Sequence, residues 1–462
     1  MAGNGHRFDP VILREYDIRG VVGETLSVDD AHALGRTLGS IVARKGGRFV
    51  AVGYDGRLTS PDLEAALVEG LSRCGLVAAR IGLGPTPALY YATHMLDADA
   101  GIMVTGSHNP PSHNGFKMVL GGKAFWGSDI QQLGAAAAAG DWVDGTGRTM
   151  RADITGAYVA RLLTGYRSDR ELTVVWDPGN GAAGEVVQAV VRDLPGRHIL
   201  LNETIDGTFP AHHPDPTVEA NLDQLKAAVA EHGADLGVGF DGDGDRVGAI
   251  DGHGRVIWGD QILAILAADL LPRCPGAPIL ADVKASQVLF DEIERLGGKG
   301  VMAPTGHSII KTRMAELGAP LAGEMSGHIF FADGYYGFDD GVYAAIRLIN
   351  AIAASGKSAA ELRDALPQVV NTPEIRIDVI EERKFAIVEE TRDRLANLQG
   401  VSVNDIDGVR VTNSEGWWLL RASNTQNALV VRCEAASEGA LESLKEQVLG
   451  QLRASGIEPP RF

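Results

Sequence analysis

Apolar runs alternate with amphipathic segments along most of the chain. Residues 49–52 form an apolar run that predicts a buried strand. The segment before it predicts a helix, because its apolar residues keep helical spacing at Ala33, Leu34, Leu38 and Ile41. Ser27, followed three residues later by Asp30, is a suitable N-terminal cap for that helix. Strands that alternate with helices in this way predict largely parallel sheets covered on both faces.

A weak repeat lies within this alternation. Four apolar runs end in an aspartate followed closely by loop residues, at 50–55, 174–177, 236–241 and 279–282. They suggest several α/β units, each with a polar loop at the carboxyl end of a strand, where open α/β sheets bind ligands. The final segment differs, because the alternation at Ile375, Ile377 and Val379 and the short apolar runs after it predict an antiparallel α+β module.

Composition and charge restrict the class of protein. The 462 residues exceed what one core supports, and 45% apolar with 22% charged residues is typical of a globular protein. A net charge of −18 argues against nucleic acid or an anionic membrane as partner. Three cysteines without a CxxC pair indicate reduced thiols, and the N-terminus shows no signal-peptide pattern, so we expect a cytoplasmic protein.

The residues from 101 to 117 hold a candidate nucleophile. An apolar run ends at Val104, and the sequence then changes to Thr-Gly-Ser-His-Asn-Pro-Pro. Two prolines and a glycine there predict a rigid functional loop after a buried strand. Ser107 is the nucleophile candidate, with His108 beside it and Lys117 further on.

The segment Asp241-Gly-Asp-Gly-Asp-Arg246 predicts a metal site. Its three carboxylates alternate with glycines directly after an apolar run, so all three can fold toward one point. Oxygen ligands suit Mg²⁺, and three of them leave places for a phosphoryl oxygen. An EF-hand calcium site is unlike this segment, because the twelfth position from Asp241 is Gly252 and not a glutamate. The competing interpretation is a solvated acidic turn.

Two later loops have the composition of binding sites. Glu324, Ser326 and His328 lie in a short polar loop that suits sugar hydroxyls, although a tight turn has the same composition. The segment Arg421-Ala-Ser-Asn-Thr-Gln offers one guanidinium and several neutral donors, as a phosphate cradle requires. A polar hairpin turn is the alternative there.

Two glycine motifs point to other functions. Residues 179–184 fit GxGxxG after a predicted strand, with Glu203 further on, which suits an NAD(P)-linked oxidoreductase. A βα turn without a nucleotide is the favoured interpretation. Gly356-Lys357-Ser358 resembles the end of a P-loop, but position 351 is alanine and the preceding residues read as helix, so a helix–helix junction is predicted.

The motifs together favour phosphoryl transfer over ester hydrolysis. A serine hydrolase typically has Gly-x-Ser-x-Gly, whereas the second residue after Ser107 is Asn109. A metal triad and a separate phosphate cradle are superfluous for hydrolysis of an ester. They suit phosphoryl transfer, in which catalysis is mainly positioning and charge neutralisation.

Four motifs, at residues 105–110, 241–246, 323–328 and 421–425, resemble in order and spacing those of the α-D-phosphohexomutase superfamily. They are most similar to its bacterial phosphomannomutase/phosphoglucomutase branch. The resemblance covers essentially the whole chain. It implies three related α/β mixed-sheet domains and a C-terminal α+β domain around a central cleft. We place them at residues 1–152, 153–254, 255–368 and 369–462, carrying the phosphoserine, metal, sugar and phosphate loops respectively.

The resemblance also implies an activity, the reversible transfer of a phosphoryl group between C1 and C6 of mannose and glucose phosphates through a phosphoserine and a 1,6-bisphosphate intermediate. It implies that phosphorylated Ser107 carries the group and binds Mg²⁺ together with Asp241, Asp243 and Asp245. The implied catalytic set adds His108, Lys117, Arg19 and His307, of which Lys117, His307 or Arg19 would handle protons. The implied substrate-binding residues are Tyr16, Arg246, Lys284, Glu324, Ser326, His328, Arg421, Ser423, Asn424 and Thr425.

Further expectations concern specificity and partners. The family often has Asp-Tyr where this chain has Ser112-His113, and its glucosamine-phosphate mutases commonly have glutamine where Met325 stands. Met325 therefore favours neutral hexoses, with phosphoglucosamine mutase as the alternative. We expect hexose phosphates as substrates, glucose or mannose 1,6-bisphosphate as activator, no nucleic acid or membrane partner, and a monomer, with a dimer left open.

Overall fold

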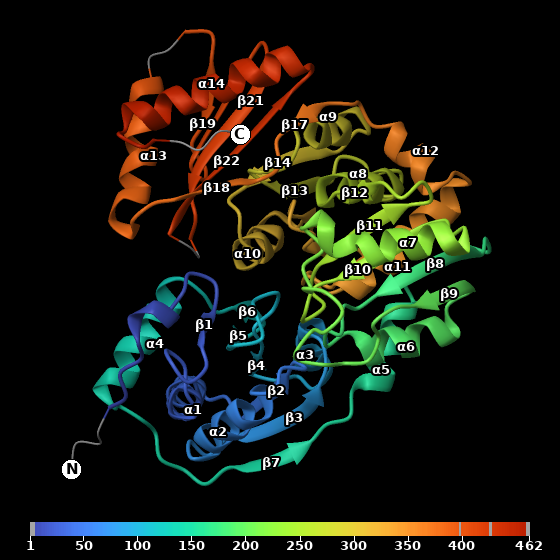
Figure 1. The fold of residues 1–462 in the computed structure, drawn as a ribbon. Helices are drawn as coiled ribbons and strands as arrows, with labels where there is room; N and C mark the ends of the chain where they lie inside the picture. The colour runs from blue at the N-terminus through green and yellow to red at the C-terminus, as the bar shows by residue number, and fades with distance from the viewer. Residues whose placement is uncertain (1–4, 397–398, 425–426, 459–462) are drawn as a thin grey trace.

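A computed structural model describes residues 5–396, 399–424 and 427–458 of the chain. Within that part, four β-sheets follow one another along the sequence, each with its own helices (Figure 1). Three sheets are mixed, and the fourth is antiparallel. The predicted α/β class with a C-terminal α+β domain is confirmed, whereas the exact domain boundaries and the central cleft stay predictions.

The first unit contains the largest sheet, ordered β1-β5-β4-β2-β3-β7 with β6 beside β5. Its strands are β1 (Ile18–Val21), β2 (Phe49–Tyr54), β3 (Val77–Leu83), β4 (Ala100–Val104), β5 (His113–Leu120), β6 (Lys123–Ala124) and β7 (Arg148–Arg151). Its helices are α1 (Val28–Arg44), α2 (Ser60–Ser72), α3 (Thr86–Met95) and α4 (Ser128–Ala139), and a 3₁₀ turn, η1, covers Pro10–Ile12. Ser27 caps α1 in a capping box with Asp30, as predicted.

The second and third units repeat the first in smaller form. Unit two has strands β8 (Leu172–Asp177), β9 (Gly196–Leu200), β10 (Leu236–Phe240), β11 (Val247–Asp251) and β12 (Val256–Ile257), with α5 (Thr155–Leu163), α6 (Gly184–Asp193), η2 (Glu219–Leu222) and α7 (Asp223–His232). Unit three has β13 (Pro278–Asp282), β14 (Lys299–Ala303), β15 (Leu321–Gly323) and β16 (Ile329–Phe331), with α8 (Gly259–Leu270), α9 (Gln287–Arg295), α10 (His307–Leu317), α11 (Gly341–Ser355) and α12 (Ala359–Asp364).

The three α/β units share one strand order. The series β5-β4-β2-β3, β11-β10-β8-β9 and β16-β15-β13-β14 are equivalent, with three parallel strands and one antiparallel strand in each. Three of the four aspartate-ended runs, which are β2, β8 and β13, are the first strands in chain order of these four-strand series. The fourth, at residues 236–241, is instead the third strand of the second unit, so the sequence repeat does not mark one unit per run.

The antiparallel strand of each unit changes the expected setting of the site loops. The phosphoserine, metal and sugar loops join β4 to β5, β10 to β11 and β15 to β16, so each connects two antiparallel neighbours and not a strand to a helix. The Arg421 loop likewise joins two antiparallel neighbours, β21 (Gly416–Ala422) and β22 (Ala428–Ala435). The apolar-to-polar switch at Val104 was interpreted correctly as a strand end, but the returning strand that carries Lys117 was not predicted.

The C-terminal unit differs in architecture from the rest. Its strands β17 (Val370–Asn371), β18 (Ile375–Asp378), β19 (Ser402–Asn404), β20 (Val409–Asn413), β21 (Gly416–Ala422) and β22 (Ala428–Ala435) pair antiparallel throughout. Helices α13 (Glu381–Leu395) and α14 (Glu438–Ala454) pack against this sheet (Figure 1).

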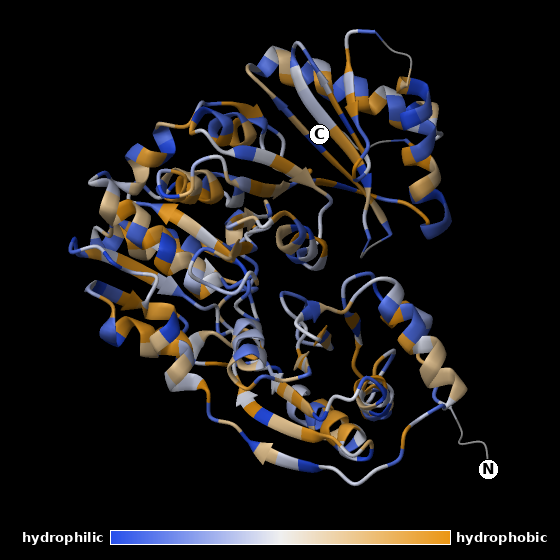
Figure 2. Cartoon of the chain, turned by 180° about the vertical axis from the view of Figure 1, so that it is seen from behind, coloured by the Kyte–Doolittle hydropathy of each residue, from blue (hydrophilic) through white to orange (hydrophobic). Residues whose placement is uncertain are grey.

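Apolar burial holds the units together. In Figure 2 apolar residues concentrate on the strands, while α13 and α14 are banded with polar ones, as expected for helices with one buried face. One apolar cluster runs through units two and three and includes Leu89 and Tyr91 of α3 in the first unit. The C-terminal unit has a separate cluster around Trp418 and Leu444. Within the described ranges, no helix combines the length and the hydropathy that crossing a membrane would need.

Candidate functional site

Ser107 lies buried between the first two units. Its side chain is almost fully enclosed, and its Oγ donates to Asp241 Oδ2 at 3.1 Å and lies 3.2 Å from His108 Nδ1. The backbone of Ser107 has φ of +50°, a left-handed conformation that is uncommon for a serine. The loop therefore holds this hydroxyl in one defined direction, toward the aspartate loop.

Arg57 is a buried residue that sequence reasoning did not assign to the site. Its guanidinium donates to the backbone carbonyls of residues 107, 109, 110 and 113, at 2.7, 2.6, 2.6 and 3.0 Å. Asp55 accepts from Arg57 Nε at 3.2 Å and from the Gly106 amide at 3.1 Å. The sequence contains a signal for this pair, because Asp55 ends one of the four apolar runs and Arg57 lies two residues later.

Asp241, Asp243 and Asp245 converge as the sequence predicts. All three are fully buried, and one carboxylate oxygen of each lies within 4.8 Å of the others. Burial and the two neighbouring carboxylates raise the pKa of Asp241 well above its usual value. Asp243 Oδ1 and Asp245 Oδ1 have no hydrogen-bond partner. Buried carboxylate oxygens without partners are costly unless a cation binds them, so this set fits a divalent metal ion.

Lys117 reaches this triad from strand β5. Its Nζ donates to Asp243 Oδ2 at 2.7 Å and to Asp245 Oδ2 at 2.5 Å. Burial by itself lowers the pKa of Lys117, but the carboxylates of Asp243 and Asp245 outweigh it, and the pKa lies well above its usual value. The ammonium therefore offsets part of the negative charge in the triad and joins the first unit to the second.

A histidine pair connects the aspartate loop with the third unit. His328 Nε2 accepts from Arg246 Nε at 2.9 Å, and since an arginine can only donate, the ring proton lies on Nδ1. That Nδ1 lies 3.0 Å from Asp339 Oδ2 and 3.4 Å from Asp245 Oδ1. His307 stacks on His328 with ring centroids 5.4 Å apart.

Two histidines of the site are held neutral by their surroundings. Burial and the Lys311 ammonium, whose Nζ lies 3.2 Å from His307 Nδ1, keep the pKa of His307 well below its usual value. Burial, followed by the nearby Arg246 and Arg19, does the same for the pKa of His108. A neutral imidazole can accept a proton, which Lys117 in its present contacts cannot.

The sugar-type loop, residues 324–328, is ordered by hydrogen bonds that its residues make. Glu324 Oε1 accepts from the Gly306 amide at 2.6 Å, and its Oε2 accepts from Ser326 Oγ at 3.1 Å. The Met325 amide donates to Asp282 at 3.0 Å. Lys284 is also buried here, with its Nζ 3.1 Å from Glu374 Oε2. This geometry brings Glu324, Ser326 and Lys284 to the carboxyl edge of the third sheet.

The Arg421 loop meets the other units through a few side chains. Arg421 Nε donates to Asp407 Oδ2 at 3.0 Å, and that oxygen also accepts from the Thr305 amide at 2.9 Å. Asn424 Nδ2 donates to Tyr16 Oη at 2.7 Å, and Tyr16 donates to the Thr305 carbonyl at 2.7 Å. Asp407 was not predicted, since nothing in the sequence places it beside Arg421.

Three further predicted residues lie as follows. Ser423 is buried, and its amide donates to the Ala428 carbonyl at 2.9 Å. Arg19 donates to Asn109 Oδ1 at 3.0 Å and pairs with Asp17, so it contacts the phosphoserine loop from strand β1. Thr425 falls outside the described residues.

The two glycine motifs serve packing. The turn at residues 179–184 joins β8 to α6, but the Asn180, Gly181 and Ala182 amides donate to protein carbonyls at 2.8–2.9 Å. A pyrophosphate would need those donors, so the contacts support a βα turn without a nucleotide. The P-loop-like segment is the predicted helix junction, because Gly356 ends α11 in a left-handed cap and Ser358 caps α12.

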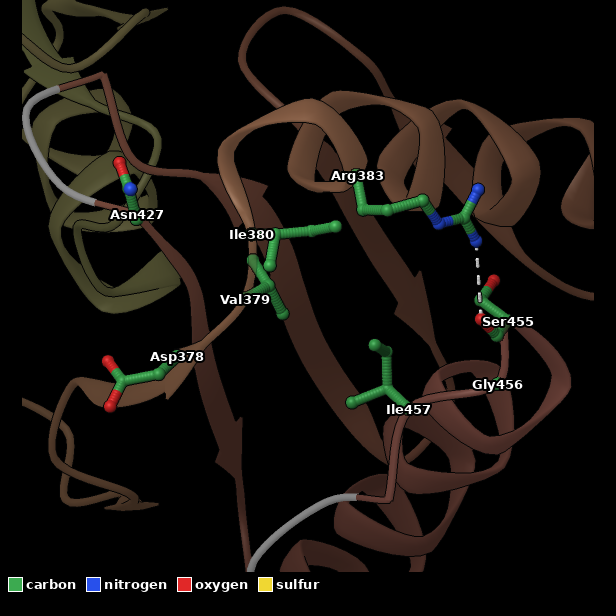
Figure 3. A pocket seen from close by; sticks show the side chains of 8 residues that line it. All are labelled: Asp378, Val379, Ile380, Arg383, Asn427, Ser455, Gly456 and Ile457. Atoms are coloured by element: carbon green, nitrogen blue, oxygen red, sulfur yellow. Dashed lines mark hydrogen bonds between the residues drawn. The ribbon is translucent and has the colours of Figure 1, made fainter.

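A cavity of about 870 Å³ lies elsewhere, on the C-terminal unit (Figure 3). Ile380 and Ile457 line it, and Arg383 donates to the Ser455 carbonyl at 3.3 Å along its rim. Among the eight residues that line it, only Arg383 is cationic, and the predicted site residues are absent. The chemistry described above is therefore separate from this cavity.

Comparison with known proteins identifies relatives along the whole chain. Family models for domains I, II, III and the C-terminal domain of phosphoglucomutase/phosphomannomutase match residues 10–143, 156–254, 258–370 and 374–451. A phosphomannomutase/phosphoglucomutase of Pseudomonas aeruginosa is 44% identical over 443 residues, 96% of each chain. A phosphoglucomutase of Neisseria gonorrhoeae is 40% identical, covering 94% of this chain and 95% of its own. The crystal structure of a phosphoglucomutase/phosphomannomutase family protein from Burkholderia thailandensis is 40% identical, with a TM-score of 0.92 over 97% of this chain and 98% of that one.

Proposed function

Because the chain belongs to the phosphoglucomutase/phosphomannomutase family, we propose that it transfers a phosphoryl group between C1 and C6 of glucose and mannose phosphates. The observation that carries the proposal is the contact of Ser107 Oγ with the Asp241 loop, at 3.1 Å in a buried site. In this contact Ser107, the candidate nucleophile, lies beside three aspartates that suit a metal ion bound to phosphate.

The proposed reaction has two transfers. In the first, the phosphoserine P–Oγ bond breaks and a P–O bond forms to the free hydroxyl of the hexose phosphate, giving a 1,6-bisphosphate. The hydroxyl proton passes to a basic group of the site. In the second, after the bisphosphate has turned end for end, the other phosphoryl group returns to Ser107 Oγ, and the isomeric monophosphate receives a proton. Nothing is consumed overall, so phosphoserine is regenerated in each cycle.

Asp241, Asp243 and Asp245 are the residues that would hold Mg²⁺, with Ser107 as the fourth protein ligand once it is phosphorylated. Their unpartnered oxygens support this assignment. The ion would supply neutralisation of charge on the transferring phosphoryl group. Lys117 and Arg246 add positive charge at the same place, since Lys117 contacts Asp243 and Asp245, and Arg246 Nε lies 4.0 Å from Asp241 Oδ2.

For proton handling we propose His307 first. Its pKa lies well below the usual value, because the site is buried and Lys311 is close, so the ring is neutral before the transfer and is a weak base that would accept the hydroxyl proton only as the new P–O bond forms. Lys117 is charged in its present contacts, and the Arg19 guanidinium donates to Asn109 and pairs with Asp17. These two residues, with His108, then contribute by orienting and stabilising charge on the phosphoryl group.

The second phosphate and the sugar would bind on the other side. We assign the distant phosphate to Arg421, Ser423, Asn424 and Thr425, and the sugar hydroxyls to Glu324, Ser326 and His328. Tyr16 and Lys284 lie between these sets, because Tyr16 contacts Asn424, and Lys284 lies 3.8 Å from Asp282, which binds the Met325 amide. One fixed grip on the distant phosphate explains how either end of the bisphosphate can face Ser107.

The decisive experiment combines mass spectrometry with one substitution. We expect intact-mass measurement of the purified protein to find one phosphate, located on Ser107 by peptide analysis, after incubation with glucose 1,6-bisphosphate and Mg²⁺. Ser107→Ala is expected to lose mutase activity by at least ~10³-fold, since a nucleophile of this type has no substitute. Full activity of Ser107→Ala would refute the proposal.

Substrate choice is proposed from Met325. A neutral methionine in this loop supports glucose and mannose phosphates over glucosamine phosphate. A panel of the three 1-phosphates, each with a 1,6-bisphosphate activator, tests that choice, and preference for glucosamine 1-phosphate would favour the phosphoglucosamine mutase alternative. The NAD(P)-linked alternative would require nicotinamide binding, which calorimetry measures. We further propose a cytoplasmic location, which three free cysteines support, and a monomer, with a dimer as the alternative.

A further inference from the structure

We propose that Arg57 is a positioning residue for the phosphoryl transfer, because it fixes the direction of Ser107 through the backbone of the phosphoserine loop. The inference rests on the proposed function and adds a residue to it. Arg57 makes no hydrogen bond to the three aspartates or to the sugar-type loop among the described residues. It acts only through the loop that carries Ser107.

The loop needs a donor of this kind because of its prolines. The carbonyls of Asn109 and Pro110 belong to peptide bonds whose nitrogens are those of Pro110 and Pro111, so these peptides have acceptors but no N–H. Buried or half-buried carbonyls without partners are costly. One guanidinium offers five N–H donors in a fixed plane, and the two terminal nitrogens of Arg57 donate to four carbonyls of the turn.

The position of Arg57 is itself tightly determined. Its side chain is fully buried, and Asp55 holds its Nε and its backbone amide, at 3.2 and 3.0 Å. Asp55 also accepts from Ser60 Oγ at 2.6 Å. A side chain at Gly106 would come within 2.4 Å of Arg57 Nε, so the loop can approach the guanidinium only through a glycine.

The second unit closes over the guanidinium. The Phe209 ring lies 5.2 Å from Arg57 Cζ, within the range of a cation–π contact. In the same unit, a Cβ at Gly242 would lie 2.4 Å from the Ser107 carbonyl oxygen, so the loop that carries the aspartate triad also approaches this carbonyl directly. Arg57 therefore fixes the Ser107 loop at the place where it meets the aspartate triad, and the left-handed φ of Ser107 is held from both sides.

These contacts predict a specific kinetic defect. Without Arg57 the loop retains Ser107 but not its direction, and misplacement of about 1 Å typically lowers the rate by about 100-fold. The distant phosphate grip at Arg421 is untouched. We therefore expect Arg57→Gln to lower kcat about 100-fold while KM changes less than about threefold. Lysine keeps the charge but not the planar set of donors, so Arg57→Lys should also lose at least about tenfold in kcat.

The control is Arg36→Gln. Arg36 is a buried arginine of the same unit that also bonds a backbone carbonyl, an aspartate and an aromatic face, at Arg73, Asp144 and Trp142. It has no contact with the phosphoserine loop among the described residues. Both variants are purified as full chains, checked for folding by circular dichroism, and assayed with glucose 1-phosphate, glucose 1,6-bisphosphate and Mg²⁺. The rate of phosphate loss from Ser107 in buffer is followed by intact mass.

The outcomes separate the possibilities. Support is a selective fall of kcat in Arg57→Gln and Arg57→Lys, with faster phosphate loss, while Arg36→Gln keeps the wild-type kcat. Equal kcat values in wild type and Arg57→Gln would overturn the positioning role, and so would equal losses in Arg57→Gln and Arg36→Gln. If the Arg57 variants do not fold, Phe209→Leu replaces them, with a predicted fall in kcat of about threefold to tenfold from loss of the cation–π contact. Retained activity in Ser107→Ala would instead refute the proposed function itself.

Discussion

The two ends of the site are built differently. At the phosphoserine end, Ser107, the three aspartates and Lys117 are buried, and the first two units are joined there by charged side chains. At the Arg421 end, Asn424 donates to Tyr16 of the first unit, and Asp407 accepts from Arg421 and from the Thr305 amide. The reacting end is thus a fixed electrostatic environment, and the distant end is a grip made of a few hydrogen bonds.

This difference separates catalysis from binding. Groups that stabilise a transferring phosphoryl group must be ordered before the reaction, because reorganisation in the transition state costs rate. A group that holds the non-reacting phosphate serves both orientations of the bisphosphate and must release it to let it turn. Substitutions at the first end should therefore change kcat, and substitutions at the second should change KM.

The largest effect is expected at the metal triad. Asp243→Asn removes one carboxylate ligand and should lower kcat by about 10³-fold in saturating Mg²⁺. The midpoint of thermal unfolding should also fall, because the substitution removes a charged partner of the buried Lys117 ammonium, which holds the pKa of Asp243 below its usual value although burial alone would raise it. Steady-state kinetics and a thermal melt measure the two quantities. A kcat within a factor of ten of wild type would show that this end does not depend on the triad.

Arg421→Ala should act mainly on KM. Loss of a guanidinium hydrogen-bonded to phosphate costs about 3 kcal/mol, which corresponds to about a 100-fold rise in KM. The kcat at saturation should change much less, since Ser107 and the triad are untouched. A titration with glucose 1-phosphate resolves both constants. A fall in kcat with unchanged KM would break the division between the two ends.

Glu374→Gln should make the stability less dependent on pH. Lys284 lowers the pKa of Glu374 to about 2, so the folded protein holds this carboxylate charged more strongly than the unfolded chain does. The lowered pKa stabilises the folded protein at pH values above about 4.3, which is the pKa in the unfolded chain, and this stabilisation is lost as the pH falls toward 2. Urea unfolding at pH 7 should show wild type more stable than the variant by up to about 3 kcal/mol.

The matching measurement is made at low pH. At pH 3 the gap between wild type and Glu374→Gln should be smaller than at pH 7, because protonation removes the charge of Glu374 in the wild type. A gap that stays constant between these values would mean that the Lys284 pair does not contribute through charge.

The smallest effect is expected for Tyr16→Phe. The phenol is kept protonated, since burial raises the pKa of Tyr16, and it donates to Thr305 and accepts from Asn424. Two neutral hydrogen bonds contribute about 1 kcal/mol each, so KM should rise by up to about 30-fold. A larger change in kcat than in KM would place Tyr16 with the reacting end.

The sequence was sufficient for residues that stand in motifs. Ser107, the three aspartates and Glu324 each follow an apolar strand, and Arg421 lies near the end of one. The contact of Ser107 with Asp241 joins the first two of these loops. The capping box at Ser27 and the helix junction at Gly356 were predicted from local chemistry alone. The three related units were predicted from the resemblance to the superfamily. The repeat of aspartate-ended runs did not define them, because one run is β10, the third strand of the second unit.

Other features depend on contacts between distant residues. Asp407 contacts Arg421 and Thr305, which no spacing in the sequence reveals. Arg57 follows an aspartate-ended run, but the sequence does not show that it contacts the carbonyls of residues 107, 109, 110 and 113. The strand β5 was missed because Lys117 and its polar neighbours interrupt the apolar pattern, although β1 and β4 flank it. Its charged side chain is buried only because carboxylates from the second unit surround it.

The shared strand order of the three α/β units bears on how such a site can arise. The same hairpin corner carries a nucleophile in one unit, metal-type ligands in the next and sugar-type groups in the third. Tandem duplication of one ancestral unit would leave this arrangement, with the sheets retained and only the corner loops diverging. Division of labour among copies then requires no new scaffold, and exchanging a single corner loop between relatives is the natural route by which substrate preference could change.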